Sequence, residues 1–308
     1  MRLTSIDIGT NTILMLVADV DSEHRLSVVR DEHVIARLGK GVDANRMILP
    51  DTFERVLGFL RKLKSLSDES GSQRIIARGT SALRDAKNQA EFIQFINKTL
   101  GFEISVLTGE EEAELTYIGA VSDLLQEGNN MNFGVLDIGG GSTELISGTN
   151  LEVKSKQSYD IGSVRLTERF LKMSPPSSLD VSQALSLIRS ETSRFASLSN
   201  TAKLIGVAGT LTTLAAIDLN LATFDREKVH NHLLTLDAVI TIFNRLRIKT
   251  LSELQSIPQI LPERADILLA GILILMETMK QLNANEIMVS DRGLRYGILL
   301  QELRKSNP

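Results

Sequence analysis

The sequence contains no cysteine and few prolines, and each shortage excludes a class of structure. Without cysteine the chain can form neither disulfides nor thiolate metal sites, which suits the reducing cytoplasm. Only 6 prolines and no low-complexity tract occur in 308 residues, so we expect no long linker. A chain of this length has room for two domains of ordinary size, each with its own buried core.

Long apolar runs and an excess of positive charge are missing as well. The longest uncharged apolar run, Ile267 to Met276, is about half of the ~20 residues that a membrane span requires, so it predicts a buried helix. Because the first residues already read as a strand, we expect no signal peptide and a cytoplasmic location. A net charge of −4 argues against a nucleic-acid partner. We expect no membrane partner, and the composition leaves a homodimer open.

What the chain does have is a glycine-rich stretch, FGVLDIGGGSTELISG, from Phe133 to Gly148. Glycine has no Cβ, so three consecutive glycines let the backbone turn sharply and bring its N–H groups against an anion. The two hydroxyls that follow add donors. The stretch predicts a strand, a phosphate-binding turn and a second strand, with a tight hairpin of flexible glycines as the alternative. The candidate phosphate ligands are Gly139, Gly140, Gly141, Ser142 and Thr143.

Two carboxylates flank this turn. Asp137 precedes it and Glu144 follows it. Hard oxygen ligands beside a phosphate site are the arrangement in which protein and phosphate share Mg²⁺. We therefore predict a Mg²⁺ site there, with Mn²⁺ as an alternative ion.

A second copy of this pattern lies near the start of the chain. SIDIGTNT, from Ser5 to Thr12, again places an aspartate, Asp7, before a glycine turn with polar side chains. A strand-like run, a turn and another strand-like run follow both copies, which argues against two unrelated hairpins. Paired loops of this kind hold a phosphate chain between two related lobes in the actin, Hsp70 and sugar-kinase superfamily. Gly9, Thr10 and Asn11 are therefore further candidate phosphate ligands.

Three other parts of the sequence contain candidate binding residues. The strand KLIGVA leads into a glycine turn and a helix, so Gly209 and Thr210 form another candidate anion site at a helix N-terminus. His230 and His232 have a strand-like spacing that could hold a metal, but no third histidine or thiol lies near and a structural role is favoured. Arg165 and Arg295 could contact substrate, although pairing with carboxylates is favoured for each.

Two predicted helices have acidic first turns. Asp51 and Glu54 resemble a capping box at the start of an amphipathic helix. Glu110, Glu111 and Glu112 begin another helix. Favourable interaction with the helix dipole explains at least two of these three glutamates, and one could be aimed at the site.

Taken together, the motifs resemble the exopolyphosphatase / guanosine pentaphosphate phosphohydrolase (Ppx/GppA) family of bacterial phosphatases. The similarity runs in unbroken order from Ser5 to about Leu300, and its sharpest parts are the D-I-G-G-G-S-T-E-L and T-G-E-E-E-A runs. It implies an α/β fold of two actin-like ATPase (ribonuclease H-like) domains with a phosphate-binding cleft between them. The other motifs that carry it are IDIGTNT, ARGTSALRDAKN, YDIGSVRLTE, GVAGTLTTLA and VSDRGLRYGIL.

The resemblance also implies roles for particular residues. Glu112, before the alanine of the E-E-A motif, matches the family's catalytic glutamate, and Arg84 matches the arginine that grips phosphate. Asp137 and Glu144 match its metal-associated carboxylates, and Asp7 is their counterpart in the first loop. The implied reaction is Mg²⁺-dependent attack of water on a terminal phosphoanhydride, which needs an oriented water, neutralised charge and fixed donors.

We therefore predict one domain of residues 1–124, joined by the C-terminal helix 292–308, and a second of residues 125–291. The predicted substrates are inorganic polyphosphate, guanosine pentaphosphate of the stringent response, or both. Because the chain resembles the short, two-domain form, we expect it to release long polyphosphate readily and act less processively, or to favour short chains and guanosine pentaphosphate. One alternative is an ATP-driven kinase or ATPase, for which we find no adenosine motif beyond GVAGT. The other is a non-catalytic actin-like scaffold.

Overall fold

The computed structural model describes residues 1–308 apart from 22–24, 126–129, 194–202 and 307–308. The chain forms two compact units, Met1–Gly119 with Gly293–Pro308, and Ala120–Arg292. It passes once from the first unit to the second and returns to the first for its last helix. The boundary predicted near residue 124 lies close to this division at Gly119.

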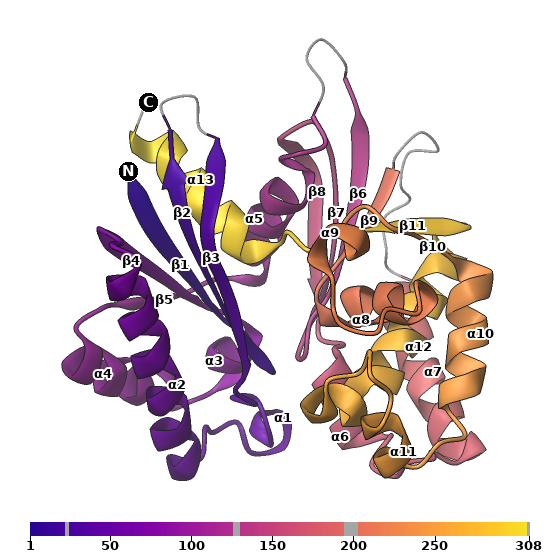
Figure 1. Cartoon of the computed structure of the whole chain (residues 1–308). Coiled ribbons are helices and arrows are strands. Elements are labelled where there is room, and N and C mark those ends of the chain that lie inside the picture. The colour runs from indigo at the N-terminus through magenta and orange to yellow at the C-terminus, as the bar shows by residue number, and fades with distance from the viewer. Residues whose placement is uncertain (22–24, 126–129, 194–202, 307–308) are drawn as a thin grey trace. The chain divides into compact units, whose positions relative to one another are not determined.

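The first unit is built on a five-stranded sheet in the order β3-β2-β1-β4-β5 (Figure 1). β1, β4 and β5 run parallel, whereas β2 is antiparallel to both β1 and β3. The elements are β1 Arg2–Ile8, β2 Thr12–Val20, β3 Leu26–Ile35, α1 Val42–Asn45, α2 Pro50–Glu69, β4 Arg74–Gly79, α3 Ser81–Asp85, α4 Gln89–Leu100, β5 Ile104–Val106, α5 Gly109–Val121 and α13 Leu294–Ser306.

Apolar side chains cover both faces of this sheet, which is why β1 is buried along most of its length. One core joins Ile6 to α2 and α4, and another joins Leu3 to α5 and α13. α13 approaches α5 closely at Gly297, where a Cβ would fall 1.8 Å from the carbonyl oxygen of Leu115. Glycine is required at that contact, and the contact fixes the position of α5.

The start of α2 differs from the prediction. The amphipathic helix is confirmed, because Val56, Leu60 and the other periodic apolar residues are buried. The predicted capping box of Asp51 and Glu54 is wrong: the N-cap is Leu49, and no side chain caps the helix. Proline occupies the first helical turn, where the N–H group it lacks would have no intrahelical partner.

The second unit has a six-stranded sheet in the order β10-β11-β9-β6-β7-β8. β6, β9 and β11 are parallel, and β7, β8 and β10 are antiparallel to their neighbours. The elements are β6 Asn132–Ile138, β7 Thr143–Thr149, β8 Glu152–Tyr159, α6 Ser163–Arg169, α7 Ser178–Thr192, β9 Lys203–Val207, α8 Gly209–Asp218, α9 Arg226–Val229, β10 Leu233–Thr235, α10 Leu236–Leu246, α11 Leu251–Gln255, the 3₁₀ helix η1 Pro262–Arg264, α12 Ala265–Gln281 and β11 Glu286–Val289.

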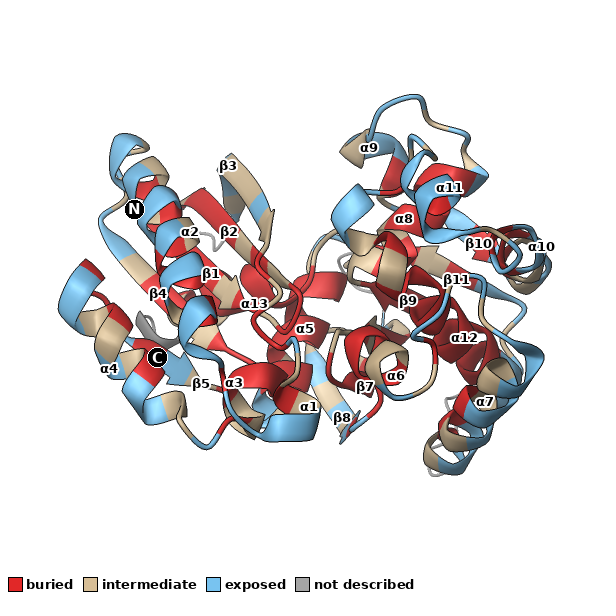
Figure 2. Cartoon of the chain, turned by 90° about the horizontal axis from the view of Figure 1, so that it is seen from below, coloured by how far each residue is buried: buried red, intermediate tan, exposed pale blue. Residues whose placement is uncertain are grey.

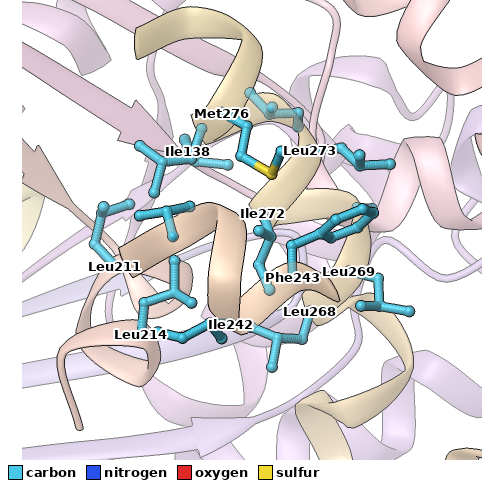
Figure 3. Packing of buried hydrophobic residues seen from close by; sticks show 14 of the residues in the cluster. Ile138, Leu211, Leu214, Ile242, Phe243, Leu268, Leu269, Ile272, Leu273 and Met276 are labelled. Carbon is cyan, nitrogen blue, oxygen red and sulfur yellow. The ribbon is translucent and has the colours of Figure 1, made fainter. Parts of the chain in front are cut away.

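Helix α12 is the centre of the second core. Every residue from Ile267 to Met279 is buried, which confirms the predicted buried helix (Figure 2). Figure 3 shows Leu268, Ile272 and Met276 among side chains of α8 and α10. In the part of the chain that the structure describes, every helix is too short or too polar to span a bilayer.

The two units repeat one plan. Adding 130 to a residue number of the β1–β2 hairpin gives its counterpart in β6–β7, so that 7 corresponds to 137 and 14 to 144. The irregularity in the next strand pairing also repeats, at Val17/Ala18 and at Ser147/Gly148. The strand order β3-β2-β1-β4-β5 recurs as β8-β7-β6-β9-β11. The predicted pair of related α/β domains is confirmed.

Candidate active site

Each glycine loop leaves the carboxyl end of the first strand of its unit, β1 or β6. The N–H group of Gly9 donates to the carbonyl of Thr12, and that of Gly139 to the carbonyl of Ser142, both at 3.0 Å. A Cβ on Gly9 or Gly139 would fall 2.8 or 3.0 Å from that same oxygen, which leaves no room for a side chain. Ligands of open α/β sheets bind at the carboxyl ends of the strands, so both loops lie where a ligand is expected.

The loop of the second unit is held from behind by α6. The N–H groups of Ser163 and Val164 donate to its first two carbonyls, of 139 and 140, at 2.9 and 2.8 Å. The buried Arg165 donates through Nε to the third carbonyl, of 141, at 2.7 Å. In a planar trans peptide the N–H group points opposite to the C=O group, so the N–H groups of residues 140–142 point away from α6. They form a row of donors suited to an anion.

The guanidinium groups of Arg165 and Arg295 both bond to other groups of the protein. Arg165 supports the glycine loop, whereas Arg295 pairs with Asp31 through Nη2 at 3.0 Å. The sequence signal for Arg165 was only its position after the D-I-G-S turn, and its role depends on how α6 packs on the loop.

The residues predicted to bind phosphate through their side chains have different surroundings in the structure. Thr143 is fully buried and its hydroxyl donates to the carbonyl of Ile161 at 2.6 Å, so that proton is already used. Thr10 packs against Gly39, where a Cβ would meet its methyl carbon at 2.2 Å. The carbonyl of Asn11 accepts from the N–H group of Arg37 at 2.8 Å, which ties the first loop to the segment after β3.

Asp137 and Glu144 lie directly opposite each other on β6 and β7. Such residues project from one face of the sheet with Cβ atoms about 5 Å apart, and like charges there are destabilising. Glu144 is only 1% exposed, and the Ser158 hydroxyl donates to its Oε1 at 2.6 Å. The two carboxylates therefore fit a divalent cation that would offset their repulsion.

The number of carboxylates available as ligands indicates which cation would bind. Among the described residues, no group of three or more histidines and acids could hold a metal without further ligands. Mg²⁺ is usually held by one or two carboxylates together with substrate phosphate oxygens and water. The pair of Asp137 and Glu144 matches that pattern. The third predicted metal ligand, Asp7, belongs to the first unit and lies opposite Leu14, at the place where the second unit has Glu144.

Glu112 and Arg84, predicted from separate motifs, are brought together in the first unit. Nη1 of Arg84 donates to Oε2 of Glu112 at 3.0 Å and to the carbonyl of Leu107 at 2.8 Å. Glu112 is 8% exposed, and burial raises its pKa although the charge and hydrogen bond of Arg84 lower it. A carboxyl group whose pKa lies nearer neutral pH is suited to general base catalysis.

The other two glutamates of α5 have different surroundings. Glu110 is exposed. Glu111 forms a capping box with Thr108: its carboxylate accepts from the Thr108 N–H group at 2.8 Å, and its own N–H group donates to the Thr108 hydroxyl at 3.2 Å. This box was missed in the sequence, although T-x-x-E is its usual pattern.

Helix α8 begins with Gly209 and Thr210 at the carboxyl end of β9. The guanidinium of Arg264 lies against this start, because a Cβ on Gly209 would fall 0.9 Å from its Nη1. Burial lowers the pKa of Arg264 to about 10. A cation and a helix N-terminus both attract anions. Sequence reasoning missed Arg264, although an arginine just before a long apolar run was a visible signal.

The two histidines are held separately by carboxylates. Nε2 of His232 lies 2.7 Å from Asp218, whereas His230 lies 2.7 Å from Asp123 and 2.9 Å from Asp291. His230 follows α9 and His232 precedes β10, so their spacing is not that of a strand. The favoured structural role fits these contacts.

Comparison with known proteins identifies the family. Residues 16–306 match the model of the Ppx/GppA phosphatase family. The chain belongs to that family. Exopolyphosphatase 2 of Mycobacterium tuberculosis is 33% identical to it over 314 residues, which cover 97% of this chain and 98% of the relative. The Ppx/GppA family member of Aquifex aeolicus, a solved structure, is 32% identical with a TM-score of 0.83 and covers 100% of this chain and 99% of its own.

A longer relative matches the same region. Guanosine-5'-triphosphate,3'-diphosphate pyrophosphatase of Pseudoalteromonas translucida is 27% identical over 306 residues, which cover 98% of this chain and 60% of the relative. Membership of the Ppx/GppA family indicates that this chain is a phosphatase. In each of its units the candidate residues gather at the carboxyl ends of the parallel strands, and their individual roles stay predictions.

Proposed function

We propose that this protein hydrolyses the terminal phosphoanhydride of inorganic polyphosphate, of guanosine pentaphosphate, or of both, and releases orthophosphate. The observation that supports this most directly is the ion pair of buried Glu112 with half-buried Arg84, which lies at the same carboxyl end of the parallel strands as the first glycine loop. The relatives support the substrate class, since one is named an exopolyphosphatase and another a guanosine-5'-triphosphate,3'-diphosphate pyrophosphatase.

The chain has residues suited to each requirement of the reaction. The backbone N–H groups of 140–142 and the start of α8 bind phosphate oxygens. Glu112 accepts a proton from the attacking water, and Arg84 holds the carboxylate in place. Asp137 and Glu144 would hold Mg²⁺ together with substrate oxygens, and the ion would offset the negative charge that develops on the transferred phosphoryl group.

Phosphate release from a panel of substrates tests the proposal. The panel comprises polyphosphates of several defined lengths, guanosine pentaphosphate and ATP, each with wild type and Glu112→Gln. We expect release from polyphosphate, guanosine pentaphosphate or both, little release from ATP, and loss of release in the variant. Hydrolysis of ATP alone would favour the ATPase alternative. Nucleotide-dependent sedimentation without any phosphate release would favour the scaffold alternative.

A further inference from the structure

The two glycine loops share a backbone but differ in the side chains beside them. In the second unit, Asp137 is opposite Glu144 on β7 and in register with Val207 on β9. At the equivalent places of the first unit, Asp7 is opposite Leu14 on β2 and in register with Arg78 on β4. The second loop therefore has two acids beside it, whereas the first has an acid and an arginine.

Arg78 lies on the same sheet face as Asp7, because residues in register on adjacent strands project to the same side. It is the last residue but one of β4, so it stands at the carboxyl end of the sheet beside the loop that begins at Gly9. Its side chain is half-buried, and so is that of Asp7. Part of each residue is therefore exposed to solvent.

The guanidinium of Arg78 has few partners within the protein. Its Nη1 donates to the carbonyl of Ala77 at 3.3 Å, and in the described part of the chain no carboxylate lies within ion-pair distance of it. An arginine carries five N–H donors in a planar fork that matches the oxygens of a phosphate. Arg84, six residues further along the chain in helix α3, is by contrast already bonded to Glu112 and Leu107.

We propose that Arg78 binds a phosphate group of the substrate beside the first glycine loop. The arginine then supplies in the first unit the positive charge that a metal ion would supply beside Asp137 and Glu144 in the second. A cation in register with Asp7 also makes that carboxylate a poor metal ligand, because the metal would be repelled by the guanidinium. Asp7 accordingly belongs to the phosphate subsite rather than to the metal site.

The assignment of Arg78 rests on the phosphatase activity proposed above. The test compares Arg78→Gln with Arg74→Gln as a matched control. Arg74 lies on the same strand and the same face, at the other end of β4, and pairs with Glu302. We expect Arg78→Gln to raise KM for the substrates that wild type hydrolyses by about 10- to 100-fold with kcat changed less than about 3-fold. The control is expected to keep both values.

A binding measurement separates this assignment from the proposed activity. The dissociation constant of inorganic tripolyphosphate is measured by calorimetry in the Glu112→Gln background, with and without Arg78→Gln, over a range of salt concentrations. We expect weaker binding by the same factor and a smaller dependence of the dissociation constant on salt concentration, because one charged contact is lost. If wild type releases no phosphate from any substrate but this binding difference persists, only the proposed activity has failed.

Other outcomes overturn the assignment of Arg78. Wild-type KM and an unchanged dissociation constant in Arg78→Gln would show that the arginine is merely solvated. If Arg78→Gln melts at a much lower temperature, Arg78→Lys is used, which keeps the charge and is expected to restore KM partly. Finally, Asp7→Asn should change the Mg²⁺ requirement far less than Asp137→Asn does. An equal change would return Asp7 to the metal site and contradict the subsite proposed here.

Discussion

Glu110, Glu111 and Glu112 are adjacent in the sequence yet have three different surroundings. Consecutive residues of a helix are about 100° apart, so the three carboxylates cannot share one face. Glu110 is exposed, Glu111 is the acid of the capping box, and Glu112 is buried beside Arg84. The angular spacing thus decides which glutamate can act in chemistry.

Replacement of Glu112 by glutamine tests its role as the base. Glutamine keeps the size and most of the hydrogen bonding but cannot accept the proton, so we expect kcat to fall by roughly 10²- to 10⁴-fold with little change in substrate binding. Glu110→Gln and Glu111→Gln are the controls, and each should cost at most a few tenths of a kcal/mol in stability. Single-turnover rates and melting temperatures of all three are compared. Wild-type turnover in Glu112→Gln would exclude the assignment.

Arg84 offers a second test at this scale, through pH. The charge of Arg84 lowers the pKa of Glu112 against the larger, raising effect of burial. Arg84→Gln removes the lowering influence, so the acidic limb of the pH profile of kcat/KM should move to higher pH, in addition to any loss of phosphate affinity. A profile that keeps its acidic limb in the variant would indicate that another group titrates.

At the scale of elements, the two hairpins show how one backbone is used for two purposes. The β6–β7 hairpin places Asp137 and Glu144 opposite each other, and the strand pairing rather than the loop brings them together. The β1–β2 hairpin has Asp7 opposite Leu14. Since antiparallel partners share a face, a single residue difference decides whether a hairpin presents one carboxylate or two.

The pair in the second hairpin predicts a metal requirement. We expect a chelator to abolish phosphate release and Mg²⁺ or Mn²⁺ to restore it. Asp137→Asn should raise the Mg²⁺ concentration needed for half-maximal activity at least about tenfold, because one of two anionic ligands becomes neutral. Metal titrations of wild type and variant at saturating substrate measure this. Undiminished turnover in excess EDTA would remove the metal assignment.

At the scale of the whole molecule, a charged cluster joins distant parts of the second unit. His230 lies between Asp123, which follows α5, and Asp291, which follows β11. Arg226 pairs with Asp291, and Arg292 lies 3.4 Å from Asp123. Asp123 and Asp291 stand close to the two places where the chain passes between its units. The cluster therefore ties together the ends of the second unit.

This cluster predicts a pH-dependent stability. Burial of the His230 ring favours its neutral form, but the two aspartates outweigh burial and raise its pKa to about 9. A raised pKa stabilises the folded state fully below the unfolded value of about 6.5, and the gain is lost as pH rises through 9. We expect the free energy of unfolding to fall by about 1–2 kcal/mol over that range, after allowance for solvent screening.

His230→Gln isolates the contribution of the ring. The variant should be less stable than wild type at pH 6, and the difference should shrink as the pH approaches 9. Thermal melts of both proteins across this range provide the measurement. Parallel curves, with a constant difference between the proteins, would show that the ring does not titrate as described.

Local patterns in the sequence were sufficient for several features. The two D-I-G loops and their repeat were visible because a strand, its turn and the next strand are adjacent in the chain. The buried helix around Ile267–Met276 was visible because an apolar run of that length has only one stable environment in a folded domain. Glu112 and Arg84 were found as members of separate motifs, through the family resemblance.

The tertiary structure decided which of these residues meet. Arg84 with Glu112, Arg78 with Asp7, and Arg264 with Gly209 each join segments that are far apart in the chain. Parallel strands are separated by crossover helices, and no local pattern states which residues fall into register across them. The sequence by itself therefore determined the loops, the repeat and the family. The placement of Arg78 in register with Asp7, beside the first loop, depended on how β4 pairs with β1, which only the folded sheet specifies.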